Sequence, residues 1–131
     1  MRLQATRQNP QDLFEDIASQ LFSKLIDPAQ VGEALREKVS AEGEGLEHLL
    51  EEWVATLLDL VRVQHMVFRQ FRVTELKMGE KGPYSLRAEA VGELLDPHRH
   101  SLSSETPRMV CREAHLTKDA QGYHAEIHLD Q

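Results

Sequence analysis

Two stretches of apolar residues at helical spacing constrain the fold of this chain more than any other feature. In both stretches apolar side chains recur at alternating intervals of one and three residues, first between Leu13 and Ile26 and again between Leu46 and Val61. That spacing places them on one face of an α-helix, and an apolar face has to be buried against another layer of the protein. The sequence therefore predicts two amphipathic helices that share a core.

The ends of both helices can be predicted as well. Asn9-Pro10 precedes the first helix; an asparagine can accept hydrogen bonds from free helical amides, and proline suits the first turn. Asp27-Pro28 ends this helix, because a residue before proline avoids helical angles. The second helix begins among glutamates and ends near Arg62 and His65, which matches the charges that a helix dipole favours.

After the second helix the pattern changes to alternating apolar and polar residues. Alternation on both sides of a turn at residues 79–83 predicts a β-hairpin. Further strands are predicted at residues 109–116 and 123–129, whereas the polar stretch 92–107 is expected to be a loop. These elements predict an α+β two-layer sandwich in which two amphipathic helices pack on one face of a mostly antiparallel sheet.

Two further stretches are ambiguous. Residues 2–6 could form a strand that leads into the first helix. Residues 35–42 favour helix by composition, yet their apolar side chains would share one face of a strand.

Composition narrows the class of partner. The chain has 131 residues, enough for one domain, and carries 15 basic and 22 acidic residues, for a net charge of −7. Such a chain is a poor counter-ion for a phosphate backbone, so we expect a protein, metal or small-molecule partner, with RNA contacted only indirectly or through a local patch. No stretch is apolar enough to span a bilayer, and no secretory signal follows Met1. With Cys111 as the single cysteine, a reducing cytoplasmic location is expected.

The last predicted strand carries the first candidate site. His124, Glu126, His128 and Asp130 alternate with apolar residues and therefore point to the same face. Imidazole nitrogens and carboxylate oxygens are suitable ligands for a divalent cation. The alternative, which we favour for the two histidines, is that this is simply the solvated outer face of an antiparallel sheet.

A second candidate is the segment Asp96-Pro97-His98-Arg99-His100, whose side chains could bind a metal ion or a phosphate. The alternative is a turn opened by Asp-Pro with exposed neighbours. Cys111 has apolar flanks and is not expected to be a nucleophile. Trp53 lies in the second apolar stripe and is expected in the core.

Four blocks of sequence, taken in order, resemble the archease family. They are Leu13-Phe14-Glu15-Asp16-Ile17-Ala18 with Leu21-Phe22, Leu46-Glu47-His48-Leu49-Leu50-Glu51-Glu52-Trp53, Asp96-Pro97-His98-Arg99-His100, and Glu126-Ile127-His128-Leu129-Asp130. Together they cover nearly the whole chain. The resemblance implies the archease fold, and it assigns residues 35–42 to a strand.

The resemblance also implies a function. Archeases are non-enzymatic cofactors of the RtcB-type RNA ligase that joins tRNA halves; they promote guanylylation of a ligase histidine and multiple turnover. They carry a site of acidic residues for a divalent metal such as calcium, magnesium or manganese. Asp130 matches the terminal metal aspartate of the family, and Asp96 and His100 match positions near that site. Glu126 and His128 are candidates for supporting it.

The sequence departs from the family pattern at its start. The family has an Asp-His-Thr-Ala-Asp block, preceded by a strand, immediately before the strand that here begins at Arg2, and Met1 stands where that block would have ended. A late translation start, a misassigned start or a degenerate homologue would each account for this. Because Asp130 alone cannot hold a hard cation, we expect a weak or empty metal site. The loss of a leading strand would also expose a sheet edge, which predicts self-association or a covering loop.

Two other functions compete with the ligase cofactor. The chain could be a diverged protein-interaction module that kept the fold and lost the metal site. It could also be a small metal-dependent enzyme, provided that His98, His100, His124 and His128 converge.

Overall fold

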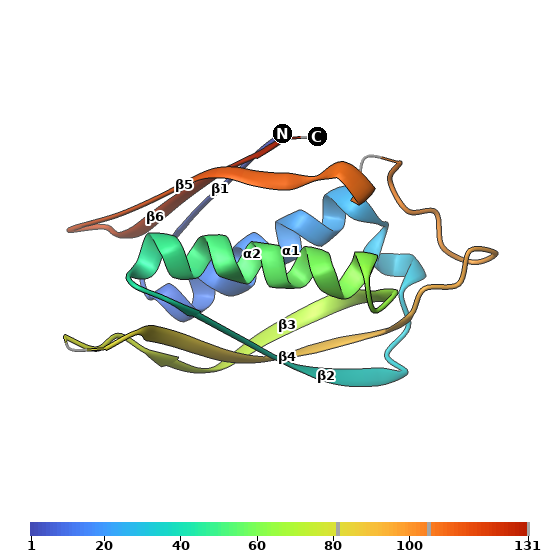
Figure 1. Cartoon of the computed structure of the whole chain (residues 1–131), viewed down its shortest axis with the longest axis horizontal. Helices are drawn as coiled ribbons and strands as arrows, with labels where there is room; N and C mark the ends of the chain where they lie inside the picture. Colours follow the sequence, from blue (N-terminus) through green and yellow to red (C-terminus); the bar gives the residue numbers. More distant parts are fainter. Residues whose placement is uncertain (81, 105, 131) are drawn as a thin grey trace.

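The computed structural model describes residues 1–80, 82–104 and 106–130 and has two helices among six strands (Figure 1). In chain order the elements are β1 (Arg2–Arg7), α1 (Pro10–Leu25), β2 (Leu35–Gly43), α2 (Leu46–Arg62), β3 (Met66–Lys77), β4 (Tyr84–Leu94), β5 (Val110–Asp119) and β6 (Gly122–Asp130), with short 3-10 turns at Pro28–Gln30 and Thr106–Arg108. The α+β class, both helices and the strand assignment of β2 are confirmed.

The strands form two separate three-stranded antiparallel sheets, in the orders β1-β6-β5 and β2-β4-β3. Each helix contacts both sheets, α1 through β1 and β3, and α2 through β2 and β5. The helices therefore lie between the sheets (Figure 1), whereas the sequence predicted one sheet with both helices on one face. The reason lies in the width of the apolar stripe, because neighbouring buried pairs on α2 such as Leu49 and Leu50 can serve two layers.

The two helices meet in the core at an aromatic cluster. Trp53 of α2 is fully buried, as predicted, and its indole N–H donates a hydrogen bond to the Phe14 carbonyl oxygen of α1 at 3.0 Å. Phe22 and Phe71 pack with ring centroids 5.1 Å apart. Asn9 caps α1 as predicted, accepting a hydrogen bond from the Asp12 backbone N–H at 2.8 Å. Among the described residues, neither α1 nor α2 has the length and apolar character that a membrane-spanning helix requires.

Strand β4 continues to Leu94, so the loop predicted from residue 92 onward begins three residues later. Gly92 makes this continuation possible. A Cβ atom at this position would lie 1.9 Å from the Val67 carbonyl oxygen on β3, so only glycine allows the two strands to approach this closely. A loop was predicted from residue 92 because the residues that follow are mostly polar.

Side chains of the helices bind free backbone groups on three strands at sheet edges. Glu15 accepts a hydrogen bond from the Val73 N–H of β3 at 3.4 Å, and Gln20 donates one to the Gln4 carbonyl oxygen of β1 at 2.7 Å. Glu47 accepts another from the backbone of β5. Such contacts occupy groups that could otherwise pair with a second chain. Self-association through an edge stays a prediction, which light scattering tests.

Candidate functional site

Asp130 is the last residue of β6 and pairs in register with Val110 of β5. Its side chain is 64% exposed, and its carboxylate lies 3.4 Å from the Arg112 guanidinium. It faces an open hollow, lined by Met1, Arg2, Arg112, Glu113, His128, Leu129 and Asp130. One charged partner of this carboxylate is therefore a cation.

Glu126 and His128 lie on the outer face of the β1-β6-β5 sheet and contact each other. The His128 Nε2 atom is 3.0 Å from Glu126 Oε1, and the Arg2 guanidinium is 3.4 Å from the same oxygen. Across the sheet, the His115 ring on β5 lies 6.5 Å from the His128 ring. These groups form a half-exposed polar surface.

His124, further along the same face, is held by two neighbours. Its Nε2 atom lies 2.9 Å from Asp119 Oδ2, and its Nδ1 atom lies 3.0 Å from the Thr6 hydroxyl. The hydrogen bond with His124 is the main cause that lowers the pKa of Asp119 below its ordinary value. Both nitrogens of His124 are therefore engaged at the β5–β6 turn.

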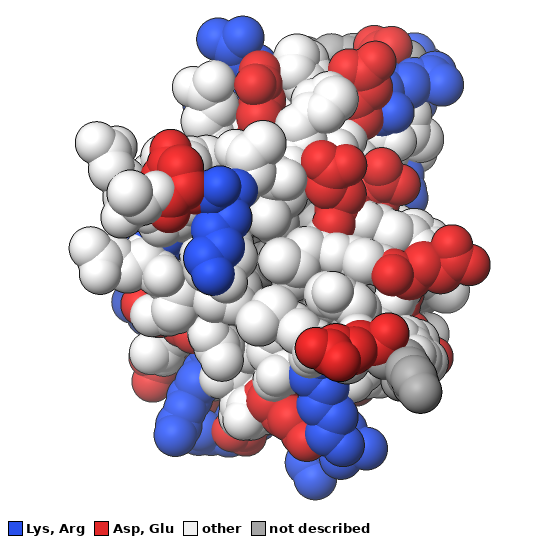
Figure 2. All heavy atoms as spheres, turned by 90° about the vertical axis from the view of Figure 1, so that its left-hand side faces the viewer, with Lys and Arg blue, Asp and Glu red and all other residues white. Residues whose placement is uncertain are grey.

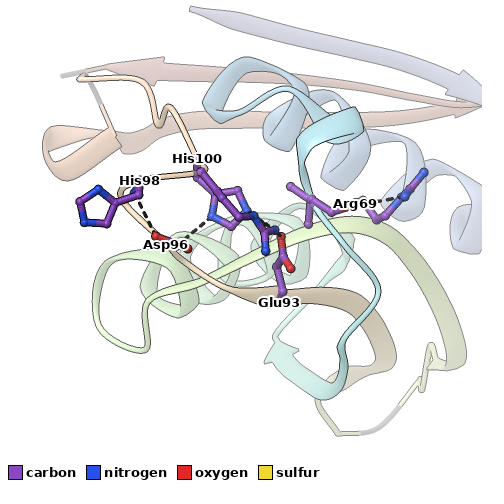
Figure 3. Close-up of polar contacts among 7 residues, drawn as sticks. Arg69, Glu93, Asp96, His98 and His100 are labelled. Atoms are coloured by element: carbon purple, nitrogen blue, oxygen red, sulfur yellow. Dashed lines mark hydrogen bonds and ion pairs between the residues drawn. The ribbon is translucent and has the colours of Figure 1, made fainter.

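Asp96 and His100 follow β4, where His100 contacts the buried carboxylate of Glu93, which was not predicted as a site residue, and Asp96 contacts His100 and His98 (Figure 3). His100, whose side chain is fully buried, places Nε2 2.6 Å from Oε1 of Glu93. The Asp96 backbone N–H donates to His100 Nδ1 at 2.8 Å. Arg99 forms an ion pair with the same oxygen of Glu93. Glu93, His100 and Arg99 form what we call the Glu93 cluster.

The geometry fixes the proton on the His100 ring. A backbone N–H can only donate, so Nδ1 of His100 accepts from Asp96 and Nε2 carries the hydrogen that is donated to Glu93. The pKa of Glu93 is lowered, first by a hydrogen bond from the Gly32 backbone N–H and then by His100 and Arg99. The cluster therefore connects the loop after β4 to the segment between α1 and β2, which contains Gly32.

A second contact holds the segment between α1 and β2. Arg69 on β3 donates a hydrogen bond to the Val31 carbonyl oxygen at 3.3 Å. Val31 is buried with Ile26 and Val67 in a small cluster on the outer side of β3. The Glu93 cluster and these contacts together fix the segment between α1 and β2 against β3 and β4. His98 lies in the same loop, where its backbone N–H is bound by Asp96 Oδ1 at 2.9 Å and its side chain is exposed.

The predicted site residues fall into three places. Asp96 and His100 lie together in the loop after β4, Glu126 and His128 lie together on the outer face of β6, and Asp130 pairs with Arg112 at the end of β6. Among the described residues, no three or more His, Cys, Asp or Glu side chains are arranged to hold a metal ion. As they stand, these side chains do not fit a divalent cation, which takes several oxygen ligands.

The residues that the sequence reading missed are Glu93 and Arg112. Glu93 lies in a stretch read as a loop, and its only signal is its place seven residues before His100, after the strand alternation of β4. Arg112 stands beside Asp130 through the pairing of β5 with β6, in a stretch where the register shifts between Cys111 and Glu113. Long-range pairing of this kind leaves no local signal.

Cys111 is poorly suited to nucleophilic chemistry. Burial raises the pKa of its thiol to about 11, with a smaller contribution from the negative charge of Glu51. Nucleophilic cysteines instead need a lowered pKa, because the thiolate is the reactive form. This agrees with the reading of Cys111 as a residue without a catalytic role.

Comparisons with known proteins agree along nearly the whole chain. Residues 1–130 match the model of the Archease protein family. Similar curated proteins include the protein archease of Methanosarcina acetivorans, 37% identical over 91% of this chain and 81% of the relative, and that of Methanosarcina barkeri, 30% identical over 99% and 88%. The solution structure of Methanobacterium thermoautotrophicum protein 1598 matches with a TM-score of 0.72 at 18% identity, covering 99% of this chain and 91% of that chain. On the strength of the family match and these relatives, the chain belongs to the archease family.

Proposed function

We propose that this chain is an accessory protein of an RtcB-type RNA ligase in the cytoplasm, and that it promotes guanylylation and multiple turnover of the ligase in tRNA splicing or RNA repair. The observation that carries the proposal is the family match over residues 1–130, supported by curated archeases that align with 99% and 91% of this chain. In this role the chain itself forms no covalent bond with RNA or nucleotide.

The side chains with potential for chemistry support an accessory role. The Cys111 thiol has a raised pKa, and the His100 ring is occupied on both nitrogens. The four histidines of the competing enzyme hypothesis belong to two regions, the loop after β4 and the strand β6 of the other sheet. The geometry therefore favours a protein that acts through its surface.

The surface at the start of α2 fits a basic partner. Figure 2 shows the face of the molecule at which α2 begins, and acidic side chains gather on one side of that face. The glutamates that the sequence places there are Glu44, Glu47, Glu51 and Glu52. Opposite charges across an interface speed the encounter and fix its orientation. We propose that this acidic end docks near a basic cleft of the ligase.

The test is a turnover assay with the ligase of the same organism in substoichiometric amount. With the chain added, ligated tRNA per ligase should rise above one, and labelling of the ligase by radioactive GTP should increase. The variant Glu44→Lys/Glu52→Lys should reduce both effects, whereas Lys24→Gln on α1 serves as the control. If the wild-type chain neither binds the ligase nor raises its turnover, the proposal fails.

A second candidate, a diverged interaction module without a metal site, is favoured by one observation. The carboxylate of Asp130 forms an ion pair with Arg112, and the described residues contain no group of three or more His, Cys, Asp or Glu side chains placed to hold a metal ion. Calorimetry with calcium, magnesium and manganese separates the candidates. Submillimolar binding that is lost in Asp130→Asn supports the metal-binding cofactor, and the absence of both binding and any effect on the ligase supports the module.

A further inference from the structure

The outer face of the β2-β4-β3 sheet is basic, although the chain as a whole is acidic. Buried residues such as Val39 and Ala88 point toward the helices, so their neighbours along each strand point outward. Among the described residues this outer face carries five cations, Arg36, Lys38, Arg72, Lys77 and Arg87, and four carboxylates, Glu42, Glu75, Glu89 and Glu93, the last of which is already bound by Arg99 and His100. It therefore holds a third of the chain's 15 basic residues but only four of its 22 acidic residues.

Three of these cations form no ion pair with any residue that the structure describes. Glu75 takes the other two, at 3.3 Å from Lys77 and 3.8 Å from Arg87. Arg36, Lys38 and Arg72 are exposed and have no such partner. In register, Glu89 stands between Lys38 on β2 and Arg72 on β3 without pairing with either. Of the three, Arg72 also lies near enough to Glu15 to lower the pKa of that carboxyl. Exposed cations that form no ion pair remain available for a ligand.

The centre of the face is hollowed. A cavity of about 480 Å³ is lined by Lys38, Val39, Ser40, Thr74, Arg87, Ala88 and Glu89. Its two cations and the Ser40 hydroxyl come from β2 and β4 and are groups that commonly bind phosphate oxygens. The Thr74 hydroxyl of β3 already donates a hydrogen bond to the Arg87 carbonyl oxygen at 3.1 Å. Figure 2 shows Lys and Arg side chains projecting from the lower edge of the molecule, where this sheet lies.

We propose that the outer face of the β2-β4-β3 sheet binds the phosphate backbone of single-stranded RNA, with Lys38, Arg72 and Arg87 as its main contacts. This goes beyond the proposed function, in which RNA is handled by the ligase. The cations are spread across three strands about 4.8 Å apart, so they suit an extended polyanion better than one mononucleotide. The face has no aromatic side chain among its described residues, so binding is independent of base sequence.

The net charge of −7 does not prevent this contact. At physiological ionic strength charges are screened beyond about 8 Å. The sheet that carries three of the seven histidines and the turn at Asp119 lies on the far side of the helix layer (Figure 1). Repulsion from that distance is weak compared with the attraction of the cations on this face, and binding is accordingly strongest at low salt.

The experiment is fluorescence anisotropy of a labelled single-stranded oligouridylate with the full chain and no ligase. The variant Lys38→Gln/Arg72→Gln should raise the Kd about tenfold and reduce the slope of log K against log salt by about 1.4, or 0.7 for each lost contact. The control Lys24→Gln/Lys118→Gln changes net charge equally, at exposed lysines on α1 and β5, and should leave the Kd nearly unchanged.

Several outcomes overturn the proposal. They are an unchanged Kd in Lys38→Gln/Arg72→Gln, an equal loss in the control, and the absence of RNA binding at low salt. Displacement of the RNA by poly-glutamate as readily as by unlabelled RNA would identify an acidic protein as the ligand, and equal displacement by GTP would identify a nucleotide. Circular dichroism confirms folding of both variants. Because the ligase is absent, the result is independent of the turnover assay.

Discussion

Glu47 in the first turn of α2 accepts a hydrogen bond from the backbone N–H of Leu116 at 2.9 Å, across 69 residues of sequence. The carboxylate thus occupies a free group on β5 that lies at the edge of its sheet, while its charge favours the N-terminal end of α2. One side chain therefore joins the helix layer to the β1-β6-β5 sheet, and it closes an edge against unwanted pairing.

Substitutions of Glu47 separate the contribution of its hydrogen bond to stability from that of its charge. Glu47→Ala should lower the free energy of unfolding by about 1–2 kcal/mol, through the lost hydrogen bond and the lost charge near the helix end. Glu47→Gln keeps an acceptor oxygen and should cost less. Urea unfolding followed by circular dichroism measures both. Equal stability of the wild type and Glu47→Ala would show that the contact does not matter in solution.

Trp53 should be the most sensitive position of the helix pair. Trp53→Phe removes the hydrogen bond to the Phe14 carbonyl oxygen and leaves a cavity in a fully buried region. We expect a loss of about 2–3 kcal/mol. Val63→Ala at the exposed end of α2 is the control and should change stability by less than about 0.5 kcal/mol. A Trp53→Phe variant as stable as the control would contradict this.

Trp53 and Glu47 also illustrate what could be predicted from the sequence. Trp53 lies in a stripe whose spacing alone specifies a helix and a buried face, so its place in the core was accessible from local pattern. The partner of Glu47 was not, because it depends on which layer faces α2. The same limit applies to the division of the strands into two sheets, since strand pairing joins residues that are far apart in sequence.

For the candidate site, too, only the positions of some residues could be predicted from the sequence. Asp130 could be placed at the end of a strand from alternation, and Asp96 and His100 could be placed in one segment from spacing. Their surroundings could not be predicted. Arg112 reaches Asp130 through the pairing of β5 with β6, and Glu93 reaches His100 because Gly92 lets β4 continue beside β3. Electrostatic partners of this kind require the fold.

Cys111 should react slowly with alkylating agents. Its pKa of about 11, against an ordinary value of 9.0, reduces the thiolate fraction near pH 8 about a hundredfold. Iodoacetamide labelling followed by mass spectrometry should therefore be slow at pH 8 in the folded chain and become fast in urea. Glu51→Gln should accelerate labelling only slightly, because burial is the larger cause. Labelling as fast as that of glutathione would contradict the buried environment.

Glu93 should make stability depend on pH in the acid range. Its pKa in the folded chain lies below the ordinary value of 4.5, because Gly32, His100 and Arg99 favour the carboxylate. Its contribution is therefore fully present above about pH 4.5 and is lost as the pH falls through the folded pKa. Wild type should exceed Glu93→Gln in stability at neutral pH, and the difference should shrink steadily as the solution is acidified below pH 4.5. Thermal unfolding measured across this range tests the sign, with Asp119→Asn as a second lowered carboxyl at the opposite sheet. A difference between wild type and Glu93→Gln that stays constant from neutral to strongly acidic pH would mean that the cluster does not hold the carboxylate in its charged form.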